Sequence, residues 1–152
     1  MHIKVRKTKM NWNENRRKLL AKLIDEMVRS EEGSCFIVEG TKDEKALRSI
    51  GVKSPIVKVS GPKSLFDRLQ HVRCKRVIVL VDFDKAGERI VKQIVELTRG
   101  RLDVDLSLRR KLCSLLKKDL KDIEGLEALI RQLKVEYPSE FGSALTPGII
   151  ES

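Results

Sequence analysis

The stretch "RVIVLVDFDKAGERI", residues 76–90, places five consecutive apolar residues directly before Asp82 and Asp84. An apolar run of this length, rich in β-branched residues, predicts a strand that is buried on both faces of a parallel sheet. The segment after Gly87 has apolar residues at helical spacing, which predicts that a helix follows the strand. This stretch therefore predicts an α/β fold and marks the end of one strand with two carboxylates.

A second strand, in "FIVEGTKDEKA" (residues 36–46), has the same plan and ends in Glu39 before a glycine. The carboxyl ends of parallel strands lie at one edge of a sheet, so the three carboxylates converge if these two strands are neighbours. Alternate residues of an extended segment face the same way, so Asp82 and Asp84 can both face one ion. Oxygen ligands of this kind suit Mg²⁺ or Mn²⁺.

The acidic residues also have a structural explanation. An aspartate after a strand is often only the N-cap of the next helix, and Asp84 before "KAGERI" suits that role. Glu39 alone would be weak evidence for a metal site, because acidic residues are common in turns. Two such strand ends in one chain, each followed by a glycine and a helix, favour the metal-site hypothesis.

The rest of the chain predicts strands that alternate with helices. Such alternation indicates right-handed βαβ units and a four-stranded parallel sheet with helices on both faces, preceded by an N-terminal helical extension. We expect a basic arm and amphipathic helix in residues 1–32, the α/β domain in 33–125, and a helix with an irregular tail in 126–152. The predicted strands are 35–40, 55–60, 76–82 and 102–108, and the predicted helices begin near residue 13 and span 43–50, 62–72 and 88–99.

The C-terminal tail, "YPSEFGSALTPGIIES", contains prolines and glycines that exclude a long helix or a central strand. Its apolar residues favour a strap over the domain, with a partner-binding segment as the alternative. These residues are Phe141, Leu145, Ile149 and Ile150.

Composition and charge restrict the partner and the location. The 152 residues carry a formal net charge of +10, which favours nucleic acid over a merely solvated basic surface or adaptation to heat. Arg16 and Arg17, beside the basic arm, are candidate nucleic-acid contacts. The three cysteines lack the spacing of a zinc site or a disulfide framework and indicate a reducing, cytoplasmic location. No apolar run reaches the length of a membrane span, and no signal peptide is expected.

At the two strand ends the sequence resembles the Toprim family, the catalytic domain shared by topoisomerases, primases and several nucleases. The resemblance covers about residues 33–125. It implies a Rossmann-like parallel sheet, general acid/base chemistry at Glu39, Mg²⁺ binding at Asp82 and Asp84, and supporting roles for their neighbours. The matching residues are Glu39, Gly40 and Asp43 in "IVEGTKD", and Asp82, Asp84, Gly87 and Glu88 in "VLVDFDKAGERI".

Departures from the family pattern indicate the subfamily. Topoisomerase versions usually carry a third acidic residue where this chain has Ala86, and the sole tyrosine, Tyr137, is expected to be structural. The pattern is more similar to primases and to the 5S ribosomal RNA maturation ribonuclease, but the domains that accompany known primases are absent. The resemblance thus implies a small stand-alone Toprim protein of archaeal type, a metal-dependent nuclease or hydrolase that favours RNA over DNA. Lys42, Lys85 and Arg89 are candidate phosphate ligands.

Two alternatives belong to other functional classes. The first is a non-catalytic module that binds metal and nucleic acid within an RNA-processing or DNA-repair complex, with a protein partner or as a homodimer. The second is a phosphatase of the haloacid dehalogenase type, which also has two aspartates after an apolar strand. That family expects threonine or valine two residues beyond the second aspartate, where this chain has Ala86.

Overall fold

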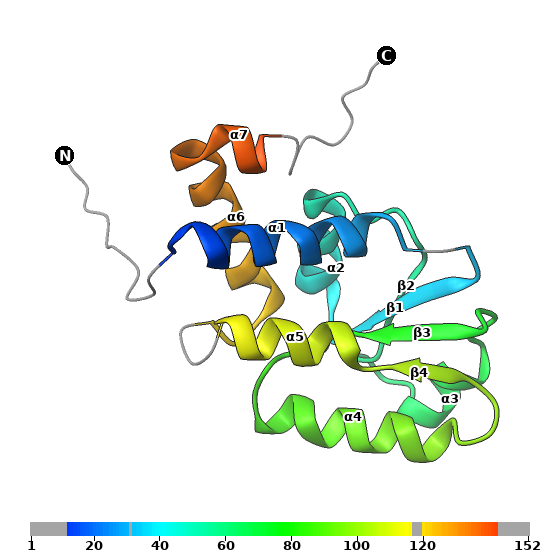
Figure 1. Cartoon of the computed structure of the whole chain (residues 1–152). Coiled ribbons are helices and arrows are strands. Elements are labelled where there is room, and N and C mark those ends of the chain that lie inside the picture. The colour runs from blue at the N-terminus through cyan, green and yellow to red at the C-terminus, as the bar shows by residue number, and fades with distance from the viewer. Residues whose placement is uncertain (1–11, 31, 117–119, 143–152) are drawn as a thin grey trace.

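A computed structural model describes residues 12–30, 32–116 and 120–142. The predicted architecture is confirmed: a four-stranded parallel sheet carries helices on both faces, and a helix precedes it (Figure 1). In chain order the elements are α1 (Glu14–Val28), β1 (Ser34–Val38), α2 (Thr41–Ile50), β2 (Ile56–Lys58), α3 (Leu65–Gln70), β3 (Arg76–Val79), α4 (Lys85–Leu97), β4 (Asp103–Asp105), α5 (Ser107–Leu116), α6 (Ile123–Glu136) and α7 (Pro138–Phe141).

The strand order β2-β1-β3-β4 makes β1 and β3 neighbours. Phe36 of β1 is in register with Ile56 of β2 on one side and with Ile78 of β3 on the other, and all pairs are parallel. The chain leaves β1 for β2 in one direction and then returns to β3 in the other, so strand order reverses between β1 and β3. In open α/β sheets this reversal point is where ligands bind, at the carboxyl ends of the strands.

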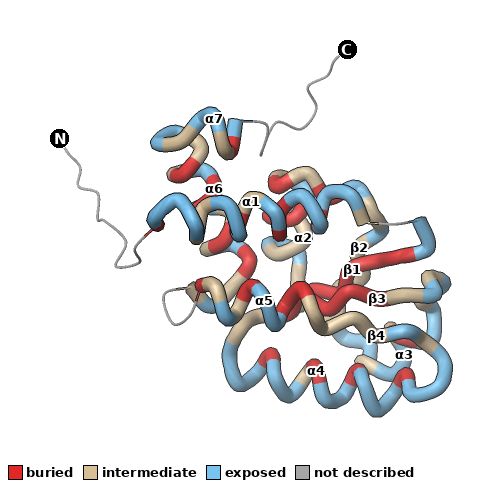
Figure 2. Tube along the Cα trace, in the orientation of Figure 1, coloured by how far each residue is buried: buried red, intermediate tan, exposed pale blue. Residues whose placement is uncertain are grey.

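Two apolar cores lie on opposite faces of the sheet, and the buried strands between them stand out in Figure 2. Alternation along the strands divides the side chains, because successive residues point to opposite faces. Phe36 and Val38 pack with α1, α2, α5 and α6, whereas Cys35 and Ile37 pack with α3 and α4. The N-terminal helix is thus part of the first core, where Leu20 and Met27 are completely buried.

Several predicted boundaries differ from the structure by up to three residues, and two of these differences have a clear local cause. The strand predicted over residues 102–108 ends at Asp105, because the Asp105 carboxylate accepts hydrogen bonds from Ser107 N and Oγ, each at 2.8 Å, and turns the chain into α5. The helix predicted from residue 62 begins at Leu65 instead. Ser64 is its N-cap and accepts from Asp67 N at 3.1 Å, so Pro62 precedes the helix.

The C-terminal part of the described chain packs on α1. Phe141, at the end of the short helix α7, is buried in the first core. Arg17 of α1 pairs with Glu140 and lies 3.8 Å from the centroid of the Tyr137 ring. The tail residues Leu145, Ile149 and Ile150 and the basic arm lie outside the described residues, and the division of the chain at residues 32 and 125 stays a prediction.

Two further observations concern membrane-spanning helices and the state of the cysteines. None of the helices in the described part of the chain is both long enough and apolar enough to cross a membrane. All three cysteines carry free thiols, and Cys35 is fully buried in the second core.

Candidate functional site

Two turns at the carboxyl edge of the sheet bring the sequence motifs together. Glu39 directly follows β1, and Asp82 lies three residues beyond the end of β3. The backbone N–H of Asp82 donates a hydrogen bond to Glu39 Oε2 at 3.3 Å, across 43 residues of sequence. The parallel pairing of β1 with β3 is therefore what places the two motifs side by side.

A carboxylate fixes the start of the helix in each turn. Asp43 reaches back from the first turn of α2 and accepts from Gly40 N at 3.1 Å. Asp84 is the N-cap of α4 and accepts from Gly87 N at 2.8 Å. Asp84 thus has the capping role that its position after a strand suggested, and its second carboxylate oxygen is not used by that bond.

Burial and repulsion by neighbouring carboxylates raise the pKa values of Glu39 and Asp82. The pKa of Asp82 rises to about 7, chiefly because burial disfavours its charge, and further because of the charges of Glu39, Asp43, Asp84 and Asp122. Burial is also the first cause of the raised pKa of Glu39, with Asp84 and Asp43 adding to it, while the hydrogen bond from Asp82 N opposes it. A bound cation would relieve this repulsion.

The carboxylates fit a hydrated divalent cation. Asp82 Oδ1 is buried and has no hydrogen-bond partner, so one hard oxygen ligand is left unsatisfied. Among the described residues, no three histidine, cysteine or acidic side chains already form a group that could hold a metal ion. Mg²⁺ is commonly held by one or two carboxylates and keeps several waters, so the donor set at this edge suits an ion of that type.

Arg109 of α5, which the sequence analysis did not select, holds the turn after β3 through hydrogen bonds. Its side chain is almost fully buried and donates to Val81 O at 3.1 Å and to Asp82 O at 2.6 Å. It also pairs with Glu88 at 2.6 Å. A sequence signal existed, because Arg109 shares the helical spacing of the buried residues Leu112 and Leu116. One buried guanidinium thus fixes two carbonyl oxygens and one carboxylate around the strand end.

Gly87 allows α4 to approach this turn closely. A Cβ atom at this position would overlap the carbonyl oxygen of Asp82, far inside van der Waals distance, and would also crowd Arg109 Nη2. The conformational freedom of glycine is not what is needed here. Glycine is required because any side chain at this position of α4 would collide with the backbone of Asp82.

The segment before α6 completes the edge, although the sequence analysis assigned no role to Asp122. Phe83 N donates to Lys121 O at 2.6 Å, which joins the aspartate turn to this segment. Asp122 is the N-cap of α6, accepts from Gly125 N at 2.7 Å, and adds its charge to those that raise the pKa of Asp82.

The basic candidates fall into two groups. Lys42, Lys85 and Arg89 are exposed on the first two turns of α2 and α4, next to the carboxylates. Arg16 and Arg17 lie on another element, α1. Arg17 donates hydrogen bonds to Glu140 and to Trp12 O. Arg16 donates to Leu115 O, and its guanidinium lies 4.3 Å from the centroid of the Trp12 ring.

Comparisons with known proteins agree with the fold. The model of the Toprim domain matches residues 34–115. The chain is 37% identical to the UPF0292 protein TK1411 of Thermococcus kodakarensis over 129 residues, which covers 84% of this chain and 95% of that protein. It is 35% identical to a UPF0292 protein of Pyrococcus furiosus, over 67% of this chain and 78% of that protein. A solved structure of a protein from Aquifex aeolicus is similar with a TM-score of 0.57 and 28% identity, over 70% of this chain and 96% of that one.

Proposed function

This chain belongs to the Toprim family, and we propose that it cleaves phosphodiester bonds of nucleic acids with the help of Mg²⁺ or Mn²⁺, with RNA as the favoured substrate. The family assignment supports a function that involves divalent metal and nucleic acid. The observation that carries the finer proposal is the buried, unsatisfied Asp82 Oδ1 beside Glu39. Two carboxyl groups with raised pKa values, at the carboxyl ends of neighbouring strands, are typical of a functional site.

The roles of the residues follow from their positions. Asp82 and Asp84 would hold the metal ion, which supplies a positive charge that stabilises the phosphate in the transition state. The raised pKa of Glu39 brings its proton exchange closer to neutral pH, so this side chain can act as general base or general acid. Asp82 N keeps the Glu39 carboxylate oriented through its hydrogen bond.

The cations near the carboxylates would hold the substrate backbone. Lys42, Lys85 and Arg89 are exposed on the helices that begin at the two turns, and we assign them to contacts with a phosphodiester at the carboxyl edge. Each neutralised phosphate contributes to affinity by release of counterions. We assign a supporting role to Gly40, Asp43, Gly87 and Glu88, since they fix the two turns through the hydrogen bonds and close approach described above.

The proposal is tested with labelled single-stranded and structured RNAs and DNAs, incubated with Mg²⁺ or Mn²⁺. We expect the wild-type protein to cleave RNA and the Glu39→Gln variant to be slower by about a hundredfold or more, because it can no longer exchange a proton. The affinity of Glu39→Gln for RNA, measured in parallel, should differ little from that of the wild-type protein. Asp103→Asn, at the opposite end of the sheet, is the matched control and should retain full activity. Equal cleavage by the wild-type, Glu39→Gln and Asp82→Asn proteins would refute a catalytic carboxylate edge.

A non-catalytic module that binds metal and nucleic acid is the second candidate. The observation that favours it is the capping bond of Asp84, which gives this carboxylate a structural purpose without any metal. Metal-dependent binding of RNA without cleavage of any substrate in the panel would support this candidate over the nuclease.

A further inference from the structure

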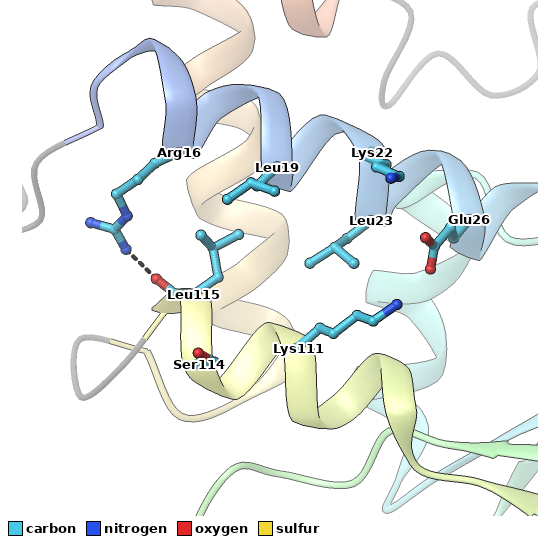
Figure 3. Close-up of a pocket in the computed structure, with 8 residues that line it drawn as sticks. All are labelled: Arg16, Leu19, Lys22, Leu23, Glu26, Lys111, Ser114 and Leu115. Carbon is cyan, nitrogen blue, oxygen red and sulfur yellow. Dashed lines mark hydrogen bonds between the residues drawn. The ribbon is translucent and has the colours of Figure 1, made fainter.

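A groove between α1 and α5 lies apart from the carboxylate edge (Figure 3). It has a volume of about 480 Å³, within the range of cavities that bind ligands. Arg16 stands at one end and Glu26 at the other. The eight residues of this α1–α5 groove are Arg16, Leu19, Lys22, Leu23, Glu26, Lys111, Ser114 and Leu115.

The floor of the groove is aliphatic and incompletely covered. Leu19 is 46% exposed, although the next residue, Leu20, is completely buried in the core. Leu115 of α5 is only half-buried, and Leu23 continues the apolar surface along α1. The apolar stripe of α1 is therefore wider than its packing against α5 requires, which leaves leucine side chains available to an apolar ligand.

The rim of the groove is basic. Lys22 on α1 and Lys111 on α5 form no ion pair within the described residues. The guanidinium of Arg16 adds a third positive charge, and Glu26 is the one acidic side chain among the described residues that line the groove. Cations around an aliphatic floor are complementary to a ligand that has a leucine-like stripe and acidic flanks.

From this arrangement we propose that the α1–α5 groove binds an acidic amphipathic helix of a partner protein. A helix laid between two others buries residues spaced at i, i+3, i+4 and i+7, and carboxylates beside that stripe would meet Lys22 and Lys111. The composition of the groove favours a peptide over nucleic acid. Single-stranded nucleic acid typically stacks its bases on aromatic side chains, and none of the described residues that line this groove is aromatic.

The position of the groove gives the partner a defined relation to the carboxylate edge. Lys111 lies two residues after Arg109 on α5, and Arg109 holds the carbonyl oxygens of Val81 and Asp82. A docked helix would therefore lie on the same element that supports the aspartate turn. The proposal does not depend on nuclease activity, since it concerns a different surface.

Two labelled 18-residue helical peptides serve as probes. Both carry leucine at i, i+3, i+4 and i+7, but one has glutamate and the other lysine on the flanks. We expect fluorescence anisotropy to show binding of the glutamate peptide at least tenfold tighter than the lysine peptide. The Leu19→Glu variant and the Lys22→Glu, Lys111→Glu double variant should each bind it at least tenfold more weakly.

A matched control separates the groove from the general positive charge of the protein. Val135→Glu adds the same single negative charge as Leu19→Glu, at an 81% exposed position of α6 that is not among the groove residues named above, and it should leave peptide affinity unchanged. The double lysine variant changes only exposed side chains, so it tests the proposal even if Leu19→Glu does not fold.

Three results would overturn the proposal. An equal loss of affinity in the Val135→Glu variant would indicate nonspecific attraction. Single-stranded RNA that displaces the peptide and binds the groove variants more weakly would make the groove a nucleic-acid surface. Self-association of the wild-type protein in sedimentation, lost in Leu19→Glu, would make a second copy of the chain the occupant.

Discussion

The turns after β1 and β3 share a plan but differ in how tightly they are built. In each, a carboxylate follows the strand and a glycine lies near the start of the next helix, with Gly40 directly before α2 and Gly87 in the first turn of α4. After β1, a Cβ atom on Gly40 would make ordinary contact with Ser60 Oγ at 3.5 Å. After β3, a Cβ atom on Gly87 would overlap the backbone of Asp82. The same sequence pattern therefore describes one tolerant turn and one that is closed by backbone contact.

The difference indicates where the precision of the carboxylate edge comes from. The β3 turn is held by the Arg109 guanidinium, by the Phe83 N to Lys121 O bond and by the contact at Gly87. The β1 turn relies on Asp43 and on the hydrogen bond between Glu39 and Asp82 N. We infer that Asp82 is positioned by its own turn and that Glu39 is positioned largely by Asp82.

The largest effect is expected for Gly87→Ala. The added methyl group must displace either α4 or the Asp82 carbonyl, and overpacking against backbone costs about 3 kcal/mol. Chemical denaturation should show this loss of unfolding free energy. Ala86→Ser, on the exposed side of the same helical turn, is the control and should change it by less than about 0.5 kcal/mol. A Gly87→Ala protein as stable as wild type would show that the turn can open.

Removal of the buried guanidinium should have the next largest effect. Arg109→Met keeps much of the side-chain volume but leaves Val81 O and Asp82 O without their donor, which costs about 2 kcal/mol. Cleavage or metal affinity should fall as well, because the aspartate turn loses its support. Arg110→Met, at the exposed neighbouring position, should leave both quantities unchanged. Equal effects of the two variants would contradict a supporting role for Arg109.

The sequence predicted the order of the elements and the residues of the two turns, because apolar runs and strand-end carboxylates are local patterns. It did not predict α5 or the roles of Arg109 and Asp122. The alternation in "LDVDLSL" continues past Asp105 by coincidence, and only the hydrogen bonds of the Asp105 carboxylate to Ser107 end the strand there. Contacts such as Arg109 to Asp82 join residues 27 positions apart, and pairing at that distance follows from packing rather than from local spacing.

The pH dependence of stability should reveal the titration of Asp82 in the β3 turn. It is measured in a metal-free buffer. The pKa of Asp82 is about 7 in the folded protein, above its ordinary value, so the folded state binds the proton more tightly than the unfolded state. The contribution of Asp82 to stability is then most favourable at low pH and falls as pH rises from about 4 through about 7. The full shift corresponds to roughly 4 kcal/mol, and solvent screening of this partly exposed group reduces the expected effect to about 1–2 kcal/mol.

The Asp82→Asn variant lacks this titration and should be more stable than wild type at pH 8, with the difference disappearing near pH 4. Asp103→Asn, remote from the edge, should follow the wild-type curve. Added Mg²⁺ should stabilise the wild-type protein at pH 8 but not the Asp82→Asn variant. A wild-type curve parallel to that of Asp82→Asn would contradict the raised pKa of Asp82.

The smallest effect is expected for Gly40→Ser, the counterpart of Gly87→Ala in the other turn. The φ angle of Gly40 is −152°, an extended conformation that any residue adopts, and the space around its Cβ position is open enough for a side chain. Serine is also a better N-cap than glycine, so the unfolding free energy should change by no more than about 0.5 kcal/mol. Because folding is unperturbed, RNA binding by this variant tests the space beside Glu39. If Gly40 leaves room there for a phosphodiester, Gly40→Ser should weaken RNA binding. The affinity for metal should stay the same. A loss of stability comparable to that of Gly87→Ala would show that the β1 turn is as tightly closed as the β3 turn.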